Sequence, residues 1–108
     1  MPVTNVEWSS VEKQIAQHAF ETAYQREIEA LIQEVRDRAS SLCELEDMWR
    51  LHDFLSARRH EIDGKYDNRD TVRIFVCAQL VKEGWLHLNE LEGLTPEKLT
   101  KVLALTRM

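Results

Sequence analysis

One short segment of the chain gathers side chains of the kinds that carry out chemistry. Residues 49–65 read WRLHDFLSARRHEIDGK and bring together imidazole, carboxylate, guanidinium and hydroxyl groups. At about 100° per residue on a helix, Trp49 lies opposite the apolar side of this segment and within a polar arc. The apolar side contains Met48, Leu51, Leu55 and Ile62, with Phe54 at its margin, and the polar arc contains His52, Asp53, Ser56, Arg59, His60 and Asp63. A large ring among charges suits a catalytic pocket, a metal site or a surface that binds another protein.

Imidazole and carboxylate groups are common metal ligands, but their spacing here does not favour a metal site. His52 and His60 are eight residues apart, so their backbone positions on one helix are separated by about 12 Å. Cys43 and Cys77 lack the close spacing of a zinc or redox motif, and we expect both to be small buried side chains. We therefore expect no metal and no other cofactor.

A catalytic triad needs a nucleophile, a base and a group that orients the base. Ser56 is four residues from both His52 and His60, but neither a glycine-rich elbow nor an oxyanion hole is recognisable. No residue is therefore predicted to be catalytic, and the protein is not expected to be an enzyme. A small enzyme built on His52 and Asp53 stays open as an alternative.

Asp53 and Arg59 have a spacing that suits partners in two different chains. They are six residues apart and about 120° apart around a helix, so they do not pair well within it. Antiparallel copies of the helix, related by a two-fold axis, would bring Asp53 of one subunit near Arg59 of the other. Alternatively both side chains are solvated, with Arg59 bonded to Asp63 one turn later. The spacing alone does not decide between these arrangements.

The elements that position these residues are expected to be helices of one domain. The chain has 108 residues with only 3 Gly and 2 Pro, and its composition is 44% hydrophobic and 31% charged. These values favour an all-α globular fold. The net charge of −5 argues against binding to nucleic acid or to an anionic membrane. Because the N-terminus lacks a signal-peptide pattern and the longest apolar run is 74–78, no membrane insertion is expected and the protein should be cytoplasmic.

Local signals predict one long N-terminal helix followed by three to four shorter ones. Ser9 and Glu12 have the spacing of a capping box, and the serines at 40–41 mark the end of a first helix of about 30 residues. The expected boundaries of the later helices are Asp47 to Asp63 with Gly64 as a left-handed cap, Asp67 as cap to a helix that Gly84 ends, and a start at Thr95 and Pro96.

The first helix is too long for a domain of this size and has two apolar stripes. At 1.5 Å per residue it measures roughly 45 Å. One stripe contains Val11, Ile15 and Ala19, and the other contains Phe20, Tyr24, Ile28, Leu31, Val35 and Leu42. We infer a homodimer in which a second subunit covers part of this helix. A monomeric bundle with a frayed N-terminal end is the alternative.

The segment described above also resembles part of a known protein family. Residues 49–84, WRLHDFLSARRHEIDGKYDNRDTVRIFVCAQLVKEG, resemble the fluorescence recovery protein family of cyanobacteria, and the similarity extends from Trp8 and residues 23–27 to the C-terminus. The resemblance implies all-helical homodimers that bind the C-terminal domain of the orange carotenoid protein. Such proteins speed the return of its light-activated red form to the orange form, which ends quenching and restores phycobilisome fluorescence.

The resemblance also implies roles for individual residues. The functional cluster of the family corresponds to Trp49, His52, Asp53 and Arg59, either at the partner or at the dimer interface. Phe75 and Lys101 correspond to partner contacts on a C-terminal head. Within a single domain of residues 1–108, about 9–64 would form the dimer and about 67–108 the head. The expected location is the cyanobacterial cytosol, near the phycobilisome and the cytoplasmic face of the thylakoid. A general helical adaptor or assembly factor without effect on the carotenoid protein is the alternative.

Overall fold

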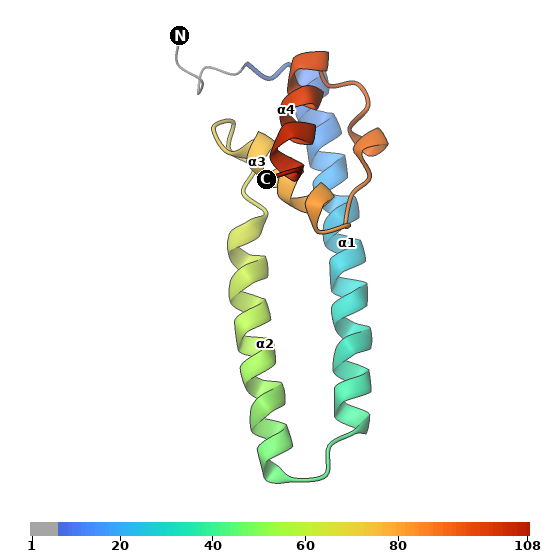
Figure 1. Cartoon of the computed structure of the whole chain (residues 1–108), viewed down its shortest axis with the longest axis vertical. Helices are drawn as coiled ribbons and strands as arrows, with labels where there is room; N and C mark the ends of the chain where they lie inside the picture. The colour runs from blue at the N-terminus through green and yellow to red at the C-terminus, as the bar shows by residue number, and fades with distance from the viewer. Residues whose placement is uncertain (1–6) are drawn as a thin grey trace.

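The chain forms a long helical hairpin with a compact group of helices at its open end (Figure 1). The structure is a computed structural model and describes residues 7–108; residues 1–6, which begin the stretch considered above for a signal peptide, lie outside the described residues. The elements are α1 (Ser10–Ser40), α2 (Leu45–Lys65), α3 (Arg73–Lys82), the 3₁₀ helix η1 (Leu88–Leu91) and α4 (Pro96–Thr106). The predicted all-α fold with one long N-terminal helix is confirmed. No helix within residues 7–108 has the length and apolarity needed to cross a membrane.

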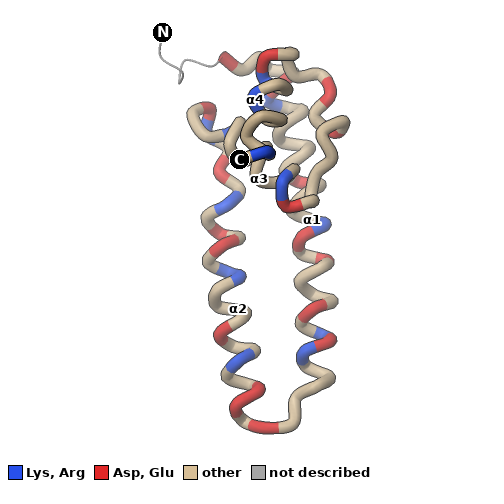
Figure 2. The backbone as a smooth tube through the Cα atoms, viewed as in Figure 1, with Lys and Arg blue, Asp and Glu red and all other residues tan. Residues whose placement is uncertain are grey.

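We call α1, α2 and their connecting loop the stem (residues 10–65), and residues 67–108 the head. The molecule measures 57 × 25 × 24 Å, so the far half of the stem extends well beyond the head. Basic and acidic residues alternate along both stem helices (Figure 2). This alternation is typical of helices whose outer faces are solvated.

The predicted boundaries of α1 are confirmed. The Ser9 hydroxyl accepts a hydrogen bond from the Glu12 amide at 3.1 Å, and the Glu12 carboxylate accepts one from the Ser9 amide at 3.1 Å. This reciprocal capping box pairs two amides that have no partner inside the helix. At the other end, the Ser40 and Ser41 hydroxyls donate to the Asp37 carbonyl, and the helix ends at Ser40, where the two serines predicted its end.

The second helix is longer than predicted at both ends. It begins at Leu45, because the Asp47 carboxylate accepts hydrogen bonds from the amides of Cys43 and Glu44, and these bonds lower the pKa of Asp47. The prediction that Gly64 is a left-handed cap is wrong, since the helix continues through Gly64 to Lys65. Tertiary contacts of Lys65, described below, hold these two additional residues in helical form.

The third helix starts five residues later than predicted, because its cap is Val72 and not Asp67. Asp67 does not cap it; instead the Asp67 carboxylate accepts hydrogen bonds from the amide and the guanidinium of Arg69 and forms a separate turn. The helix begins only at Arg73, whose guanidinium donates to Asn68 and Asp70. The prediction failed because an Asp side chain stabilises an isolated turn as readily as a helix start.

The predicted stop at Gly84 and the predicted start at Thr95 are both confirmed. Gly84 has a φ of 87°, its amide donates to the Val81 carbonyl, and the next amide donates to the Leu80 carbonyl. These two bonds form a Schellman motif, which favours glycine. The Thr95 hydroxyl accepts a hydrogen bond from the Lys98 amide at the start of α4.

The buried core lies where the first half of α1 meets the head. Its apolar members are Trp8, Ala16, Ala19, Phe20, Ala23, Ile74, Val76, Cys77, Ala78, Leu80, Leu86, Leu91, Leu94 and Val102. Cys77 is buried as predicted, and its burial raises the pKa of the thiol to about 12. The same prediction for Cys43 is wrong, because the loop that carries it turns at the far end of the stem, away from the core.

The far half of the stem leaves large apolar side chains uncovered. The predicted apolar side of α2 is only partly correct: Met48 is 53% exposed and Leu55 is also exposed. Phe54 is half-buried instead, with the Arg38 guanidinium 4.0 Å from the centre of its ring. One neighbouring helix covers a narrower stripe of α2 than a full core would. The exposed apolar side chains of the stem are Val11, Tyr24, Ile32, Leu45, Met48, Trp49 and Leu55.

Two glycine substitutions test the assigned helix boundaries. Gly64 has a negative φ and open space around its Cβ position, so Gly64→Ala should raise the free energy of unfolding by about 0.4–1 kcal/mol. Gly84→Ala should lower it by about 1–2 kcal/mol, because an L side chain is strained at positive φ. Chemical denaturation of both variants at one protein concentration measures these effects. Destabilisation by Gly64→Ala equal to that by Gly84→Ala would contradict the assignment.

Candidate protein-binding surfaces

The predicted cluster on α2 lies on the outside of the stem. Trp49 is 55% exposed, and His52, Asp53 and Arg59 are more exposed still. Trp49, His52 and Asp53 are three and four residues apart on one helix, so they share a face. The structure therefore presents this cluster as an open surface of the single chain.

Within one chain the polar members of this cluster make only weak contacts. His52 Nδ1 lies 3.3 Å from Asp53 Oδ1, and Arg59 Nε lies 3.6 Å from Asp63 Oδ2. Asp53 forms no ion pair with a lysine or arginine anywhere in residues 7–108. Ion pairs this exposed contribute about 0–1 kcal/mol. The side chains are thus available to form other contacts at little cost.

The surroundings of this cluster are shallow. Asp53, Ser56, His60 and two neighbours line only an open depression along α2. The described part of the chain contains no group of three His, Cys, Asp or Glu side chains arranged to hold a metal ion. The arrangement offers contact area, charge and one aromatic ring to another surface.

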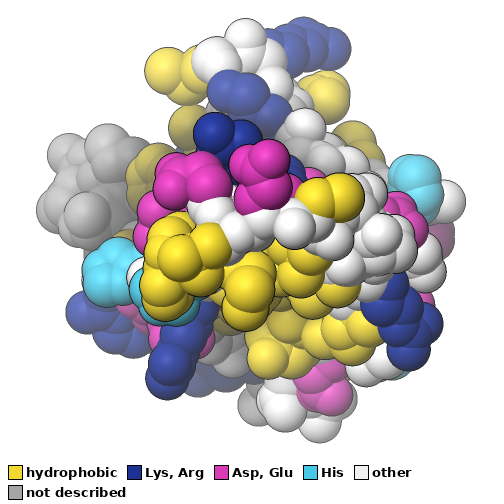
Figure 3. All heavy atoms as spheres, turned by 90° about the horizontal axis from the view of Figure 1, so that it is seen from below, with side chains coloured by type: hydrophobic (Ala, Val, Ile, Leu, Met, Phe, Trp, Pro, Cys, Tyr) yellow, Lys and Arg dark blue, Asp and Glu magenta, His cyan; other side chains and the backbone are white. Residues whose placement is uncertain are grey.

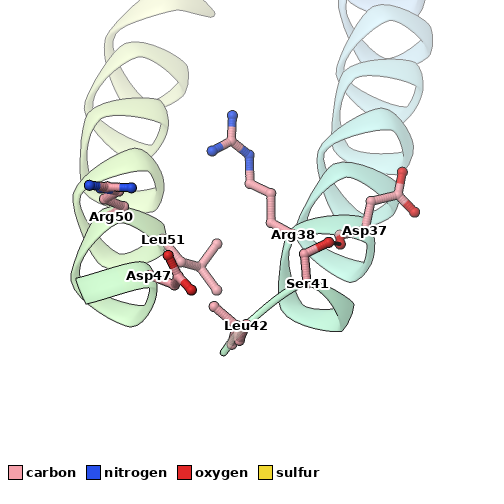
Figure 4. A pocket seen from close by; sticks show the side chains of 7 residues that line it. All are labelled: Asp37, Arg38, Ser41, Leu42, Asp47, Arg50 and Leu51. Atoms are coloured by element: carbon pink, nitrogen blue, oxygen red, sulfur yellow. Dashed lines mark hydrogen bonds between the residues drawn. The ribbon is translucent and has the colours of Figure 1, made fainter. Parts of the chain in front are cut away.

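The end of the stem that carries the loop between α1 and α2 exposes apolar side chains, among them Leu45 and Met48. Seen from that end, apolar side chains form a broad patch surrounded by charges (Figure 3). A depression lies between the ends of α1 and α2, where Leu42 and Leu51 approach one another and Arg38 extends across the gap (Figure 4). Its lining residues are Asp37, Arg38, Ser41, Leu42, Asp47, Arg50 and Leu51.

The head presents a second candidate surface. Phe75 of α3 is 56% exposed although α3 is otherwise largely buried. It lines a groove between α3 and α4 whose residues are Phe75, Ala78, Gln79, Lys82, Glu83 and Leu105, and which we call the head groove. Lys101 is half-buried and lies one helical turn before Leu105, with its ammonium 3.6 Å from Glu97. An exposed aromatic ring beside a groove and a nearby cation are typical of a protein contact.

The structure does not bring the two sets of predicted residues together. Trp49 lies in the far half of the stem, 16 residues before the end of α2, which corresponds to about 24 Å along the helix axis. Phe75 and Lys101 lie on the head at the other end (Figure 1). The predicted site is therefore two separate surfaces.

Sequence reasoning missed a buried charge cluster where the stem meets the head. Glu27 has no exposed surface. Its carboxylate accepts hydrogen bonds from Lys65 Nζ at 2.7 Å and from the Tyr66 hydroxyl at 2.7 Å, and it lies 3.5 Å from the Arg58 guanidinium. Lys65 also donates to Glu83 at 2.7 Å. We call Glu27, Arg58, Lys65, Tyr66 and Glu83 the neck cluster.

The protonation of the neck cluster follows from these bonds. Burial and the neighbouring Glu27 carboxylate both raise the pKa of the Tyr66 hydroxyl, so it stays a donor. Burial opposes ionisation of Glu83, but its hydrogen bonds from Lys65 and Gln79 outweigh burial and lower its pKa. The sequence signal was present: Glu27 falls four residues after Ala23 and seven after Phe20, on the buried side of α1.

A second missed cluster ties the start of α1 to the start of α4. The Trp8 ring contacts two cations, with its centre 4.8 Å from the Arg73 guanidinium and 5.0 Å from Lys98 Nζ. Lys98 also donates to the Glu12 carboxylate at 3.0 Å, which in turn accepts from the Thr95 amide at 3.1 Å. Burial raises the pKa of Glu12, but the hydrogen bonds from the Ser9 amide, from Lys98 and from the Thr95 amide outweigh burial and lower the pKa overall. The capping box of α1 is thus also part of the head packing.

Comparison with known proteins gives consistent matches over nearly the whole chain. The family model described as photoprotection regulator fluorescence recovery protein matches residues 8–106. The fluorescence recovery protein of Synechocystis sp. PCC 6803 is 52% identical over 94% of this chain and 93% of its own length.

Solved structures agree with the sequence comparison. The fluorescence recovery protein of Fremyella diplosiphon has a TM-score of 0.91 and 62% identity, covering 94% of this chain and 100% of its own. The Synechocystis structure has a TM-score of 0.91 and 51% identity with the same coverage. The chain therefore belongs to the fluorescence recovery protein family of photoprotection regulators.

Proposed function

We propose that this protein binds the light-activated red form of the orange carotenoid protein and accelerates its return to the orange form, which restores phycobilisome fluorescence. The observation that carries the proposal is the 52% identity over 94% of the chain with a fluorescence recovery protein. The site of action is the cyanobacterial cytosol, where the phycobilisome and the carotenoid protein meet. The protein acts without chemical turnover and is not an enzyme.

Acceleration without turnover has a simple physical basis. A protein speeds the relaxation of its partner when it binds the converting arrangement more tightly than the activated one. Each 1.4 kcal/mol of such preference corresponds to about a tenfold increase in rate. The carotenoid belongs to the partner, so this chain needs no cofactor of its own.

The head groove is the proposed docking surface for the C-terminal domain of the carotenoid protein. Phe75 offers an exposed ring that gains from burial, and Lys101 offers a cation on α4, one helical turn before the groove residue Leu105. Aromatic side chains at the centre of an interface commonly carry a large share of the binding energy. These features favour the head over the stem as the docking surface.

A second copy of the chain is the proposed cover for the stem. Trp49, Met48 and Leu45 are all exposed in the first turns of α2, and Ile32 and Tyr24 are exposed on α1. Two stems packed side by side would bury these side chains as one continuous apolar interface.

Asp53 and Arg59 fit the same homodimer. Asp53 forms no ion pair with a lysine or arginine within residues 7–108, and Arg59 has only its exposed contact with Asp63. A two-fold arrangement of antiparallel α2 helices pairs Asp53 of each subunit with Arg59 of the other. In this proposal Trp49 and His52 support the dimer and affect the partner only indirectly.

The first experiment measures decay of the red form by absorbance after addition of the wild-type protein and three variants. The wild type should accelerate decay. Phe75→Ser and Lys101→Glu should stay dimeric but bind and accelerate poorly, with a loss of about 2 kcal/mol or more in binding for Phe75→Ser. Val11→Ser removes an exposed apolar side chain that belongs neither to the head groove nor to the stem residues named above for the dimer, and it should behave as wild type.

Trp49→Leu separates the two surfaces in the same assay. We expect a weaker dimer and reduced acceleration. If Trp49→Leu stays dimeric and yet loses partner binding, the docking surface includes the stem. If the wild type at saturating concentration leaves red-form decay unchanged, the hypothesis of a general helical adaptor or assembly factor replaces this proposal. A covalent change in the carotenoid protein after incubation would instead favour the hypothesis of a small enzyme built on His52 and Asp53.

The second experiment measures dimerisation by sedimentation at micromolar concentration. Asp53→Leu or Arg59→Leu should weaken the dimer by about 2 kcal/mol or more, because each leaves its partner charge unpaired at the interface. Exchanging the two residues, Asp53→Arg with Arg59→Asp, should restore part of the loss. Asp63→Asn removes only the contact of Arg59 within the chain and should leave the dimer intact. A monomeric wild type, or intact dimers in both single variants, would exclude this pairing.

A further inference from the structure

The neck cluster joins the part of the molecule proposed to dimerise to the part proposed to bind the partner. Glu27 lies on α1, Lys65 is the last residue of α2, and Glu83 directly follows α3. Lys65 Nζ lies 2.7 Å from an oxygen of each carboxylate, and its side chain is only 6% exposed. One buried ammonium is therefore shared between a stem carboxylate and a head carboxylate.

Lys65 holds a special place among the contacts of α2. Within residues 7–108 it is the one side chain of α2 that forms a hydrogen bond with the head. Tyr66, the next residue, packs edge-on against Phe20 and Tyr24 of α1 and donates to Glu27. The end of α2 is thus fixed to α1 by several contacts and to the head by the bond from Lys65 to Glu83.

The two carboxylate oxygens of Glu83 have different partners. One carboxylate oxygen accepts from Lys65, and the other accepts from Gln79 at 2.9 Å. Glu83 and Gln79 are both lining residues of the head groove, whereas Lys65 is not. Lys65 therefore contacts Glu83, a residue of the groove wall, without lining the groove itself.

A buried, charge-assisted bond is suited to hold this wall in one position. Moving the head away from α2 would leave the Lys65 ammonium with only Glu27 and would separate opposite charges in a site of low exposure. By contrast, the ion pair between Arg26 of α1 and Glu90 of the head is more exposed, and neither of its residues lines the head groove.

We propose that Lys65 is a positioning residue that fixes the head groove relative to the stem through its bond to Glu83. This inference rests on the proposed function of the head groove. In the dimer, both grooves then take defined orientations, because the bond from Lys65 to Glu83 links the wall of each groove directly to its stem. A partner that docks on the groove meets a surface whose Glu83 and Gln79 are already oriented.

The test compares Lys65→Met and Glu83→Ala with the matched control Arg26→Met. Each removes one member of an ion pair between stem and head. Lys65→Met also leaves Glu27 with only the more distant Arg58 guanidinium as a cation, so this variant can lose stability. Glu83→Ala keeps the buried bond from Lys65 to Glu27 and changes only a partly exposed residue, which keeps the test available if Lys65→Met does not fold.

The first readout is the distance between stem and head, measured by electron spin resonance without any partner. One spin label goes on Cys43, exposed in the stem loop, and the other on an introduced Thr100→Cys on α4. Buried Cys77 stays unlabelled, and an excess of unlabelled chain restricts the measurement to one subunit. Lys65→Met and Glu83→Ala should broaden the distance distribution, and Arg26→Met should leave it close to wild type.

The second readout is the rate of red-form decay as a function of protein concentration. Misplacement of a binding surface by about 1 Å can cost up to a hundredfold in rate, so we expect roughly a tenfold or larger loss in both neck variants with the dimer intact. Unchanged distances and unchanged acceleration in Glu83→Ala would overturn the inference, as would equal effects in Arg26→Met. Failure of the wild type to accelerate decay would instead refute the proposed function, and the distance measurement would still test the positioning role.

Discussion

Glu27 is a carboxylate without exposed surface in the middle of the longest helix, and the rest of the molecule is arranged around it. An isolated buried carboxylate is costly, so the chain must bring a cation and hydrogen-bond donors to it. Lys65 and Tyr66 do so, which extends α2 past Gly64 and fixes its end against α1. The shared bond from Lys65 to Glu83 then sets where the head begins. One buried charge thus extends α2 and adds a polar link to the apolar core that joins α1 to the head.

The same arrangement leaves the far half of the stem with a single neighbour on each helix. Apolar side chains such as Met48 and Trp49 stay exposed there, while the head completes its own core around α3. The proposed function gives each of these regions its own task, with the stem contacting a second copy and the head contacting the carotenoid protein. The neck cluster is the physical connection between them.

Local signals predicted much of the fold because their chemistry is complete within a few residues. The capping box of Ser9 and Glu12 and the stop at Gly84 were correct for this reason. The prediction at Gly64 was wrong because contacts of Lys65 with residues distant in sequence extend the helix. The prediction at Asp67 was wrong because its side chain forms a local turn with Arg69 instead of a helix cap.

For the candidate site, helical geometry predicted that Trp49 lies on the outer face of its helix, and the resemblance supplied Phe75 and Lys101 as candidate head contacts. Neither could reveal the distance between these surfaces or the neck cluster, since Glu27, Lys65 and Glu83 meet only after the head packs on the stem.

The most direct measurement of the division of tasks is hydrogen exchange of the wild-type protein, residue by residue, with and without the red carotenoid protein. We expect partner binding to protect amides of α3 and α4 around the head groove. Protection confined to residues 45–60 of α2, with the head unchanged, would contradict the assignment of docking to the head.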